Sequence, residues 1–171
     1  MAEMTAQEAI EHVAIHQMLM RYSHGVDRCD LEVLKSVFWP EATCDYSNDE
    51  LNAHEWAEGA VQGLSQMERT QHTVANYMIE MKSATKATCE AYCTAYHLIK
   101  DEQGNLMDMV VGGRYLDHIE KRDGEWKIAS RTYIMDWNQN LPASGNWTEG
   151  LLGSLNTGAR KPDDPYYKVL K

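Results

Sequence analysis

The sequence predicts an α+β domain in which N-terminal helices pack on one face of a mostly antiparallel sheet. Helical periodicity and capping signals are confined to about residues 5–63, whereas the chain from Arg69 to about residue 137 reads as long strands separated by turns. No internal repeat and no linker divides the chain, whose 171 residues suit one compact domain. Helices followed by a run of strands, rather than alternating with them, are typical of α+β proteins.

The first helix is expected to begin after Thr5, which forms a capping box with Glu8. Its apolar stripe recurs at helical spacing through Ile15, Leu19, Tyr22 and Val26. Tyr22 is therefore expected on the buried side of the helix. Gly25 is predicted to end the helix, because glycine readily adopts the left-handed conformation of a C-terminal cap.

Two shorter helices are expected next. Asp30 can cap a helix from Leu31 to Phe38, which must end before Pro40 because proline restricts the residue preceding it. Asn52 can cap another helix that runs to about residue 63.

One short strand and four long strands are expected to form the sheet. The short strand lies near residues 42–46, and the long strands cover about residues 69–82, 86–100, 106–121 and 125–137. The step Asp123-Gly124 predicts a tight hairpin between the last two strands, because both residues tolerate positive φ. Residues 1–140 are thus expected to form the domain. The Gly-, Pro- and Asn-rich segment 141–171 is expected to be an extension packed on the domain or on a neighbouring subunit.

Strand alternation places polar residues within two apolar faces. One face of the first long strand carries His72, Val74, Asn76 and Met78, and one face of the last carries Ala129, Arg131, Tyr133, Met135 and Trp137. A histidine and an arginine in mid-strand cost free energy if they are buried unpaired. Each alone is compatible with a structural hydrogen bond or ion pair, so a functional interpretation depends on their combination with other groups.

The charge balance argues against some classes of partner. Sixteen basic against 26 acidic residues leave a formal net charge of −10, which argues against a nucleic acid or an anionic membrane as partner. The sequence shows no secretory signal and no stretch that approaches a membrane span, so we expect a cytoplasmic protein. Free thiols are then expected at Cys29, Cys44, Cys89 and Cys93. The spacing of these cysteines does not predict a metal site.

Three motifs follow one another along the chain: GVDR after the first helix, RTQHTVAN on the first long strand, and VGGRYLDHIEKRDGEWKIASR across the last hairpin. Together they resemble the SnoaL-like family of the nuclear transport factor 2-like superfamily, over about residues 5–140. Its members include hexachlorocyclohexane dehydrochlorinase, bile-acid dehydratase and scytalone dehydratase. The resemblance implies a cone-like α+β barrel with a curved sheet, and a homo-oligomer that is a trimer or, as the alternative, a dimer.

The resemblance also implies an active site. In the lyases of this family, an aspartate after the first helix orients a histidine on the first long strand, and an arginine on the last strand completes a polar floor. These positions fall on Asp27, His72 and Arg131. Tyr22 stands where the bile-acid dehydratase carries a tyrosine. The second histidine and the paired tyrosines of scytalone dehydratase are not placed by the motifs.

The chemistry that follows is proton abstraction with loss of a small group: water, halide, or an aldehyde such as formaldehyde. A neutral histidine with an ordinary pKa near 6.5 accepts a proton at about neutral pH. Asp27 would orient the His72 ring, Arg131 would stabilise developing negative charge, and Tyr22 would donate to the leaving oxygen or hold a substrate hydroxyl. No phosphate loop, dinucleotide fingerprint or metal motif is present in the sequence, so a cofactor-independent lyase is expected.

The aromatic content predicts a small hydrophobic substrate, aromatic or polycyclic. The residues expected to bind it are Trp39, Trp56, Asn76, Tyr96, Tyr133 and Trp137. Three alternatives stay open: an isomerase or cyclase that uses the same base, a non-catalytic β subunit of a ring-hydroxylating dioxygenase, and a ligand-binding or assembly module. Product mass separates the first from a lyase, an iron-bearing α chain that copurifies identifies the second, and binding without turnover identifies the third.

Overall fold

The structure, a computed structural model, describes residues 4–47 and 49–170. The helices are α1 (Ala6–Arg28), α2 (Leu31–Ser36), α3 (Ala53–Ser65), α4 (Gly150–Gly153) and α5 (Tyr166–Val169). The strands are β1 (Phe38–Asp45), β2 (Glu50–Asn52), β3 (Arg69–Ser83), β4 (Lys86–Lys100), β5 (Leu106–Arg122) and β6 (Glu125–Pro142).

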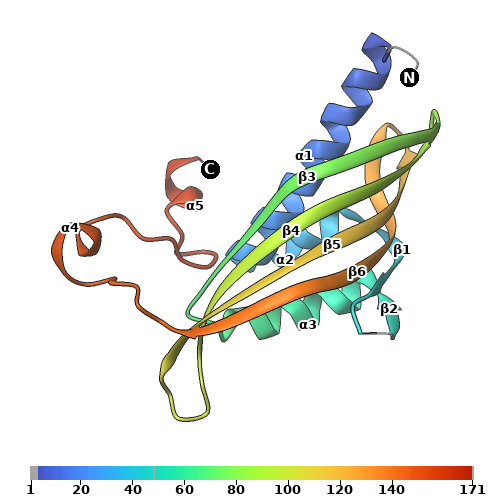
Figure 1. Cartoon of the computed structure of the whole chain (residues 1–171). Helices are drawn as coiled ribbons and strands as arrows, with labels where there is room; N and C mark the ends of the chain where they lie inside the picture. Colours follow the sequence, from blue (N-terminus) through green and yellow to red (C-terminus); the bar gives the residue numbers. More distant parts are fainter. Residues whose placement is uncertain (1–3, 48, 171) are drawn as a thin grey trace.

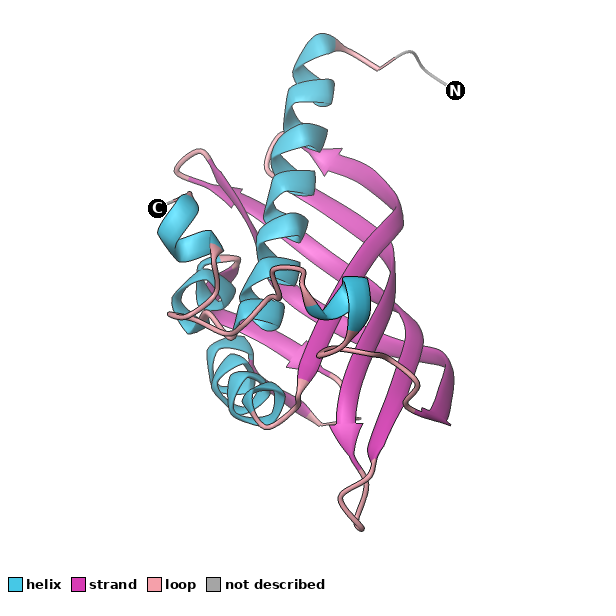
Figure 2. Ribbon diagram, turned by 90° about the vertical axis from the view of Figure 1, so that its left-hand side faces the viewer, coloured by secondary structure: helices cyan, strands magenta, loops and turns pink. Residues whose placement is uncertain are grey.

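The six strands form one curved sheet in the order β2-β1-β6-β5-β4-β3. Every neighbouring pair is antiparallel except β1 and β6, which run parallel. Strands β2 and β3 are the two edges, so the sheet is not a closed barrel. Helices α1, α2 and α3 lie against one face of the sheet (Figures 1 and 2). The predicted α+β class, with helices on one face of a curved and mostly antiparallel sheet, is confirmed.

Helix α1 begins as predicted but ends later. Thr5 and Glu8 form the expected capping box. The helix continues through Gly25 to Arg28 and ends at Cys29, whose φ of 50° is left-handed. The prediction that Gly25 ends the helix is therefore wrong. Its role is close packing, because a Cβ at this position would lie 2.9 Å from the backbone of Leu34 in α2.

The two short helices have the predicted caps. Asp30 accepts from the Val33 amide, and Asn52 accepts from the amides at the start of α3. Helix α2 ends at Ser36 rather than Phe38, and β1 begins at once. Strand β1 contains Pro40, which has no N–H for a ladder. The β1–β6 register shifts between Phe38 and Thr43, so the strand tolerates the proline there.

Bulges in two strands change the predicted faces. The β3–β4 register shifts between Val74 and Tyr77, which leaves Asn76 and Met78 exposed instead of on the face of His72. A shift in the β5–β6 register between Gly112 and Gly113 turns Trp137 to the outer face, where its ring covers Gly112. The β5–β6 turn itself is as predicted, with Asp123 and Gly124 both at positive φ.

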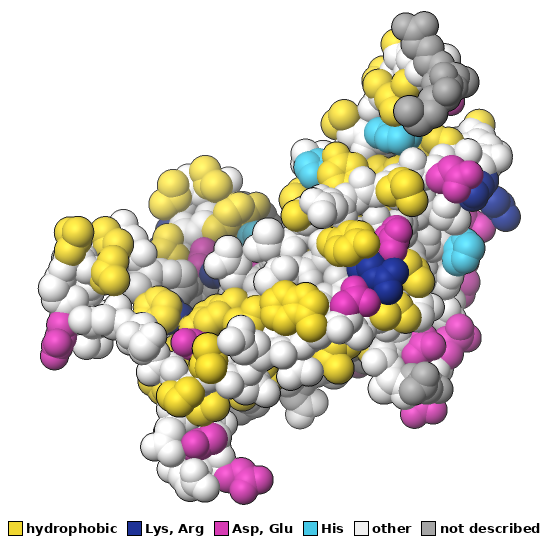
Figure 3. Space-filling model, in the orientation of Figure 1, with side chains coloured by type: hydrophobic (Ala, Val, Ile, Leu, Met, Phe, Trp, Pro, Cys, Tyr) yellow, Lys and Arg dark blue, Asp and Glu magenta, His cyan; other side chains and the backbone are white. Residues whose placement is uncertain are grey.

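The sheet face opposite the helices is partly apolar. Large hydrophobic side chains exposed there belong to Met78, Tyr92, Leu116 and Trp137. Figure 3 shows hydrophobic side chains gathered over this face, with charged groups among them. No helix within the described residues combines the length and the apolar character that crossing a membrane requires.

The C-terminal segment leaves the end of β6, passes through α4, and returns to the C-terminal end of α1 (Figure 1). The Lys161 amide donates to the Arg28 carbonyl at 2.8 Å, and the Arg28 guanidinium contacts the Asp164 carboxylate at 2.7 Å. These contacts place the segment beside the residues that follow Tyr22 on α1.

Candidate active site

A cavity of about 360 Å³ lies between helices α1 and α3 and the inner face of the sheet. Its walls are mostly apolar, with contributions from Val26, Leu64, Met67 and Ala95. The polar groups come from aromatic and imidazole side chains: Tyr22, Tyr46, Trp56, His72, His97, Tyr115 and Tyr133. An apolar cavity with a few convergent polar groups is the usual form of a small-molecule site.

Asp27 and His72 form a hydrogen-bonded pair at this cavity. Asp27 lies in the last turn of α1, and His72 lies near the start of β3. The His72 backbone N–H donates to Asp27 Oδ2 at 2.7 Å, and His72 Nδ1 lies 2.8 Å from Asp27 Oδ1. The predicted hydrogen bond between these side chains is confirmed, and of the two residues His72 lines the cavity.

The charge on Asp27 determines which ring nitrogen of His72 carries the proton. Burial alone would raise the pKa of Asp27, but the hydrogen bonds and charge of His72 outweigh it and lower that pKa. Asp27 is therefore ionised at neutral pH and can only accept hydrogen bonds. In the neutral form of the ring, His72 Nδ1 must then carry the hydrogen, which leaves the lone pair on Nε2.

His97 is a second imidazole at the cavity, and it was not among the site residues predicted from the sequence. It is 7% exposed, and its ring centroid lies 5.3 Å from that of His72 in an edge-to-face arrangement. Burial and the neighbouring His72 lower the pKa of His97 to about 4, so the ring is neutral at neutral pH. Its Nδ1 has no hydrogen-bond partner among the described residues. Alternation along β4, where Cys93, Ala95 and His97 share the inner face, is the signal that could have found it.

Hydroxyl groups gather beside Tyr22. Its hydroxyl lies 2.7 Å from that of Tyr46, and Tyr115 contacts the same ring edge to face with 5.3 Å between centroids. Burial raises the pKa of Tyr22, so it stays protonated and can donate. The pair of Tyr22 and Tyr46 was missed because Tyr46 follows a short strand whose facing cannot be read from alternation.

Arg131 does not line the cavity. Its side chain is buried and makes two 2.7 Å hydrogen bonds to Asp117 on the neighbouring strand. Burial opposes its charge, but the Asp117 carboxylate outweighs that effect and holds the pKa of Arg131 well above its usual value. The guanidinium carbon lies 4.2 Å and 4.0 Å from the ring centroids of Tyr22 and Tyr115. The arginine therefore contacts the tyrosines from behind rather than the space where a ligand would sit.

Only some of the residues expected to bind substrate lie at the cavity. Trp56 and Tyr133 line the cavity. Trp39 instead donates to the Glu120 carbonyl at 3.1 Å, and Tyr96 donates to Asp108 at 2.7 Å near a second hollow under the C-terminal segment. The remaining two, Asn76 and Trp137, lie outside the cavity as described above.

Comparison with known structures agrees with this fold. A protein of Novosphingobium aromaticivorans provisionally named as a scytalone dehydratase shares 24% identity at a TM-score of 0.72, over 82% of this chain and 94% of that chain. Hexachlorocyclohexane dehydrochlorinase of Novosphingobium barchaimii shares 21% sequence identity at a TM-score of 0.67, over 78% of this chain and 91% of that chain. A protein of N. aromaticivorans provisionally named as an aromatic ring hydroxylase shares 20% sequence identity at a TM-score of 0.64, over 75% of this chain and 92% of that chain. At these identities the likeness is one of fold.

Sequence comparison assigns the family. The chain matches no curated protein sequence at a significant level. The model of the SnoaL-like domain family matches residues 7–132, which include α1, the whole of β3 to β5 and the start of β6. The chain therefore belongs to the SnoaL-like domain family.

Proposed function

We propose that this protein is a cofactor-independent lyase that removes a proton from a small hydrophobic substrate and expels a small group. The observation that carries the proposal is the Asp27–His72 pair. One carboxylate holds both the backbone and the ring of His72, and the ring lines an apolar cavity. A ligand-binding module needs no such arrangement, whereas a general base needs a fixed tautomer and an accessible lone pair.

In the proposed reaction, His72 Nε2 takes a proton from a carbon next to an activating group. The electron pair of that C–H bond becomes the new double bond, and the bond to the leaving group breaks. The imidazolium formed is stabilised by the ionised Asp27 at 2.8 Å. A positioned base of this kind contributes about 10²–10⁴-fold to the rate.

The leaving group is the proposed partner of the tyrosines. The hydroxyls of Tyr22 and Tyr46 share one hydrogen bond, and the second hydroxyl proton remains free to donate to a departing oxygen or halide. Arg131 would act through the ring of Tyr22, since a buried positive charge 4.2 Å behind a phenol favours negative charge on its oxygen. Loss of a hydroxyl group then gives water, and loss of an aldehyde would follow from the same base acting on a hydroxymethyl O–H.

The cavity volume bounds the proposed substrate. A space of about 360 Å³ is near the lower end of the range for small-molecule sites. The stacked rings of Tyr46 and Trp56, with centroids 4.5 Å apart, offer a flat aromatic wall. An aromatic compound of one or two rings fits these features better than a larger polycyclic skeleton. The neighbours named after a dehydratase and a dehydrochlorinase support water or halide as the leaving group.

The test is turnover of a panel of aromatic compounds that bear hydroxyl, halide or hydroxymethyl groups. His72→Ala should abolish turnover and leave substrate binding intact. His118→Ala is the matched control, because His118 is exposed on strand β5 and does not line the cavity. A product with the mass of the substrate would identify the isomerase or cyclase alternative. Wild-type turnover by His72→Ala on a true substrate would refute the mechanism.

A further inference from the structure

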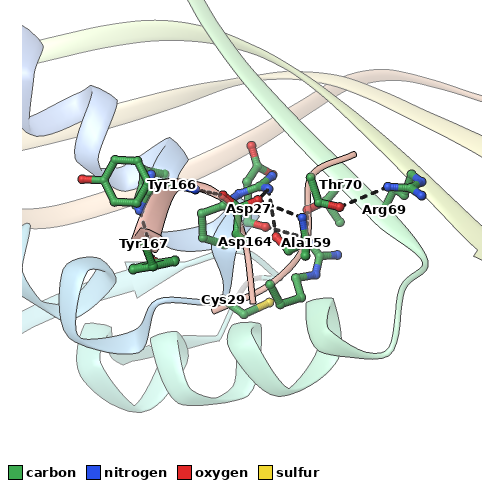
Figure 4. Close-up of polar contacts among 12 residues, drawn as sticks. Asp27, Cys29, Arg69, Thr70, Ala159, Asp164, Tyr166 and Tyr167 are labelled. Atoms are coloured by element: carbon green, nitrogen blue, oxygen red, sulfur yellow. Dashed lines mark hydrogen bonds and ion pairs between the residues drawn. The ribbon is translucent and has the colours of Figure 1, made fainter. Parts of the chain in front are cut away.

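The C-terminal segment reaches the active-site aspartate through Arg160. Its Nη1 donates to the Asp27 carbonyl and, at 2.8 Å, to Thr70 Oγ1. Its Nη2 donates to the carbonyls of Leu64 at 3.1 Å and Met67 at 3.4 Å. One guanidinium thus joins the end of α1, the end of α3 and the start of β3. Figure 4 shows Ala159 and Asp164 of the same segment beside Asp27 and Thr70.

The contact with Arg160 determines how the Thr70 hydroxyl can hydrogen-bond. An arginine can only donate, so Thr70 Oγ1 must be the acceptor of that bond. The single hydroxyl hydrogen of Thr70, a side chain that is 6% exposed, is then left for another acceptor. The Thr70 side chain contributes to the lowered pKa of Asp27, which points to the Asp27 carboxylate as that acceptor. By donating to Thr70 Oγ1, Arg160 leaves the Thr70 hydroxyl hydrogen free to donate toward Asp27.

Asp27 is held from two directions as a result. Its carbonyl accepts from Arg160, and its carboxylate accepts from His72 N and from His72 Nδ1. These contacts fix both the position and the rotation of the carboxylate. The rotation decides whether Oδ1 can face the imidazole, and hence which tautomer of His72 is stable.

We propose that Arg160 is a positioning residue of this active site: through Asp27 and Thr70 it holds His72 in the tautomer with hydrogen on Nδ1 and the lone pair on Nε2. The C-terminal segment is then a working part of the site, although it lies outside residues 7–132, over which the family model matches. The catalytic consequence rests on the proposed function. The effect on the tautomer does not, because it is a property of the free protein.

A simpler role for Arg160 would be to anchor the segment to the domain, and the neighbouring Lys161 tests this. Lys161 Nζ lies 2.8 Å from Oδ1 of Asp30, the N-cap of α2, so it ties the same segment to the turn that directly follows α1. Among the described residues, Lys161 makes no hydrogen bond or ion pair with Asp27 or Thr70. Lys161→Met removes one positive charge and one anchor, as Arg160→Met does, and is therefore the matched control.

The experiment is ¹⁵N NMR of histidine-labelled protein without ligand, which reports the tautomer of each neutral imidazole. Wild type and Lys161→Met should show His72 with hydrogen on Nδ1 only. Arg160→Met should show a mixture of the two tautomers. Thr70→Val keeps Arg160 and the shape of the side chain but removes the hydroxyl, and it should give a similar mixture, so the test stands even if Arg160→Met fails to fold.

A pure Nδ1–H tautomer in Thr70→Val, or in a folded Arg160→Met, would overturn the proposal. The same mixture of His72 tautomers in Arg160→Met and Lys161→Met would also overturn it, because docking of the C-terminal segment would then be enough to explain the tautomer of His72. With a substrate in hand, Arg160→Met should lower kcat about 10- to 100-fold with little change in KM, as expected when a reacting group is misplaced. If the tautomer shifts as expected and no substrate of the panel is turned over, the proposed lyase function fails while the positioning role stands.

Discussion

Acid should destabilise this protein through His97. The pKa of this imidazole is lowered from 6.5 to about 4, first by burial and then by the neighbouring His72. The unfolded chain therefore binds a proton near pH 6.5, whereas the folded protein resists it until about pH 4. Because the unfolded state holds more protons between these values, the free energy of unfolding falls as the pH falls through this window.

The size of the effect follows from the two pKa values. The full difference of about 2.5 units corresponds to roughly 3 kcal/mol, reached below pH 4. Between pH 7 and pH 5 the loss is about 2 kcal/mol. Carboxylates with lowered pKa values, such as Asp27, lose their stabilising effect only as the pH falls through and below the ordinary carboxyl value of 3.8. The interval from pH 7 to pH 5 therefore isolates imidazole titration from carboxylate titration.

The assay is urea denaturation of wild type and His97→Phe at pH 7, 6 and 5. Phenylalanine keeps an aromatic ring at this position but cannot be protonated, so the variant should lose about 2 kcal/mol less than wild type across this interval. Any cost of the substitution that does not depend on pH cancels in this difference. Parallel losses in the two proteins would refute the assignment of His97 as a buried neutral histidine.

Further predictions concern the Asp27–His72 pair, the buried Arg131–Asp117 ion pair, the contact between α1 and α2, and the oligomeric state. Asp27→Asn should lower kcat about 10²–10⁴-fold, because the amide can stabilise the wrong tautomer of His72; an unchanged pre-steady-state rate would contradict this. Arg131→Met should cost about 3–5 kcal/mol in urea denaturation by leaving Asp117 buried and unpaired, and adding Asp117→Leu should restore much of it. Gly25→Ala should cost about 1–3 kcal/mol, seen as a lower Tm, since its Cβ would lie 2.9 Å from the α2 backbone. Light scattering should return a multiple of 19.5 kDa, a trimer first and a dimer second, and a monomer mass would exclude both.

Features encoded by neighbouring residues could be predicted from the sequence. The capping box at Thr5, the caps at Asp30 and Asn52, and the hairpin at Asp123 depend on side chains within a few residues of the backbone groups that they satisfy. The α+β class follows from the same local periodicities, because helical and strand segments are separated along the chain. The pairing of Asp27 with His72 was predicted only through the family resemblance, since 45 residues separate them.

The remaining features were decided by tertiary packing. Bulges in β3 and β6 arise from register between strands, so alternation along one strand could not show that Asn76 and Trp137 leave the inner face. Gly25 does not end α1 because the close approach of α2 gives it a packing role. The sequence by itself determined which groups are available for proton transfer. Only the fold places His97 beside His72 and Tyr46 beside Tyr22, and only the fold places Arg131 behind the tyrosine rings. It also brings Arg160, near the C-terminus, to the Asp27 carbonyl. The sequence could not show these contacts, because they join segments that are far apart along the chain.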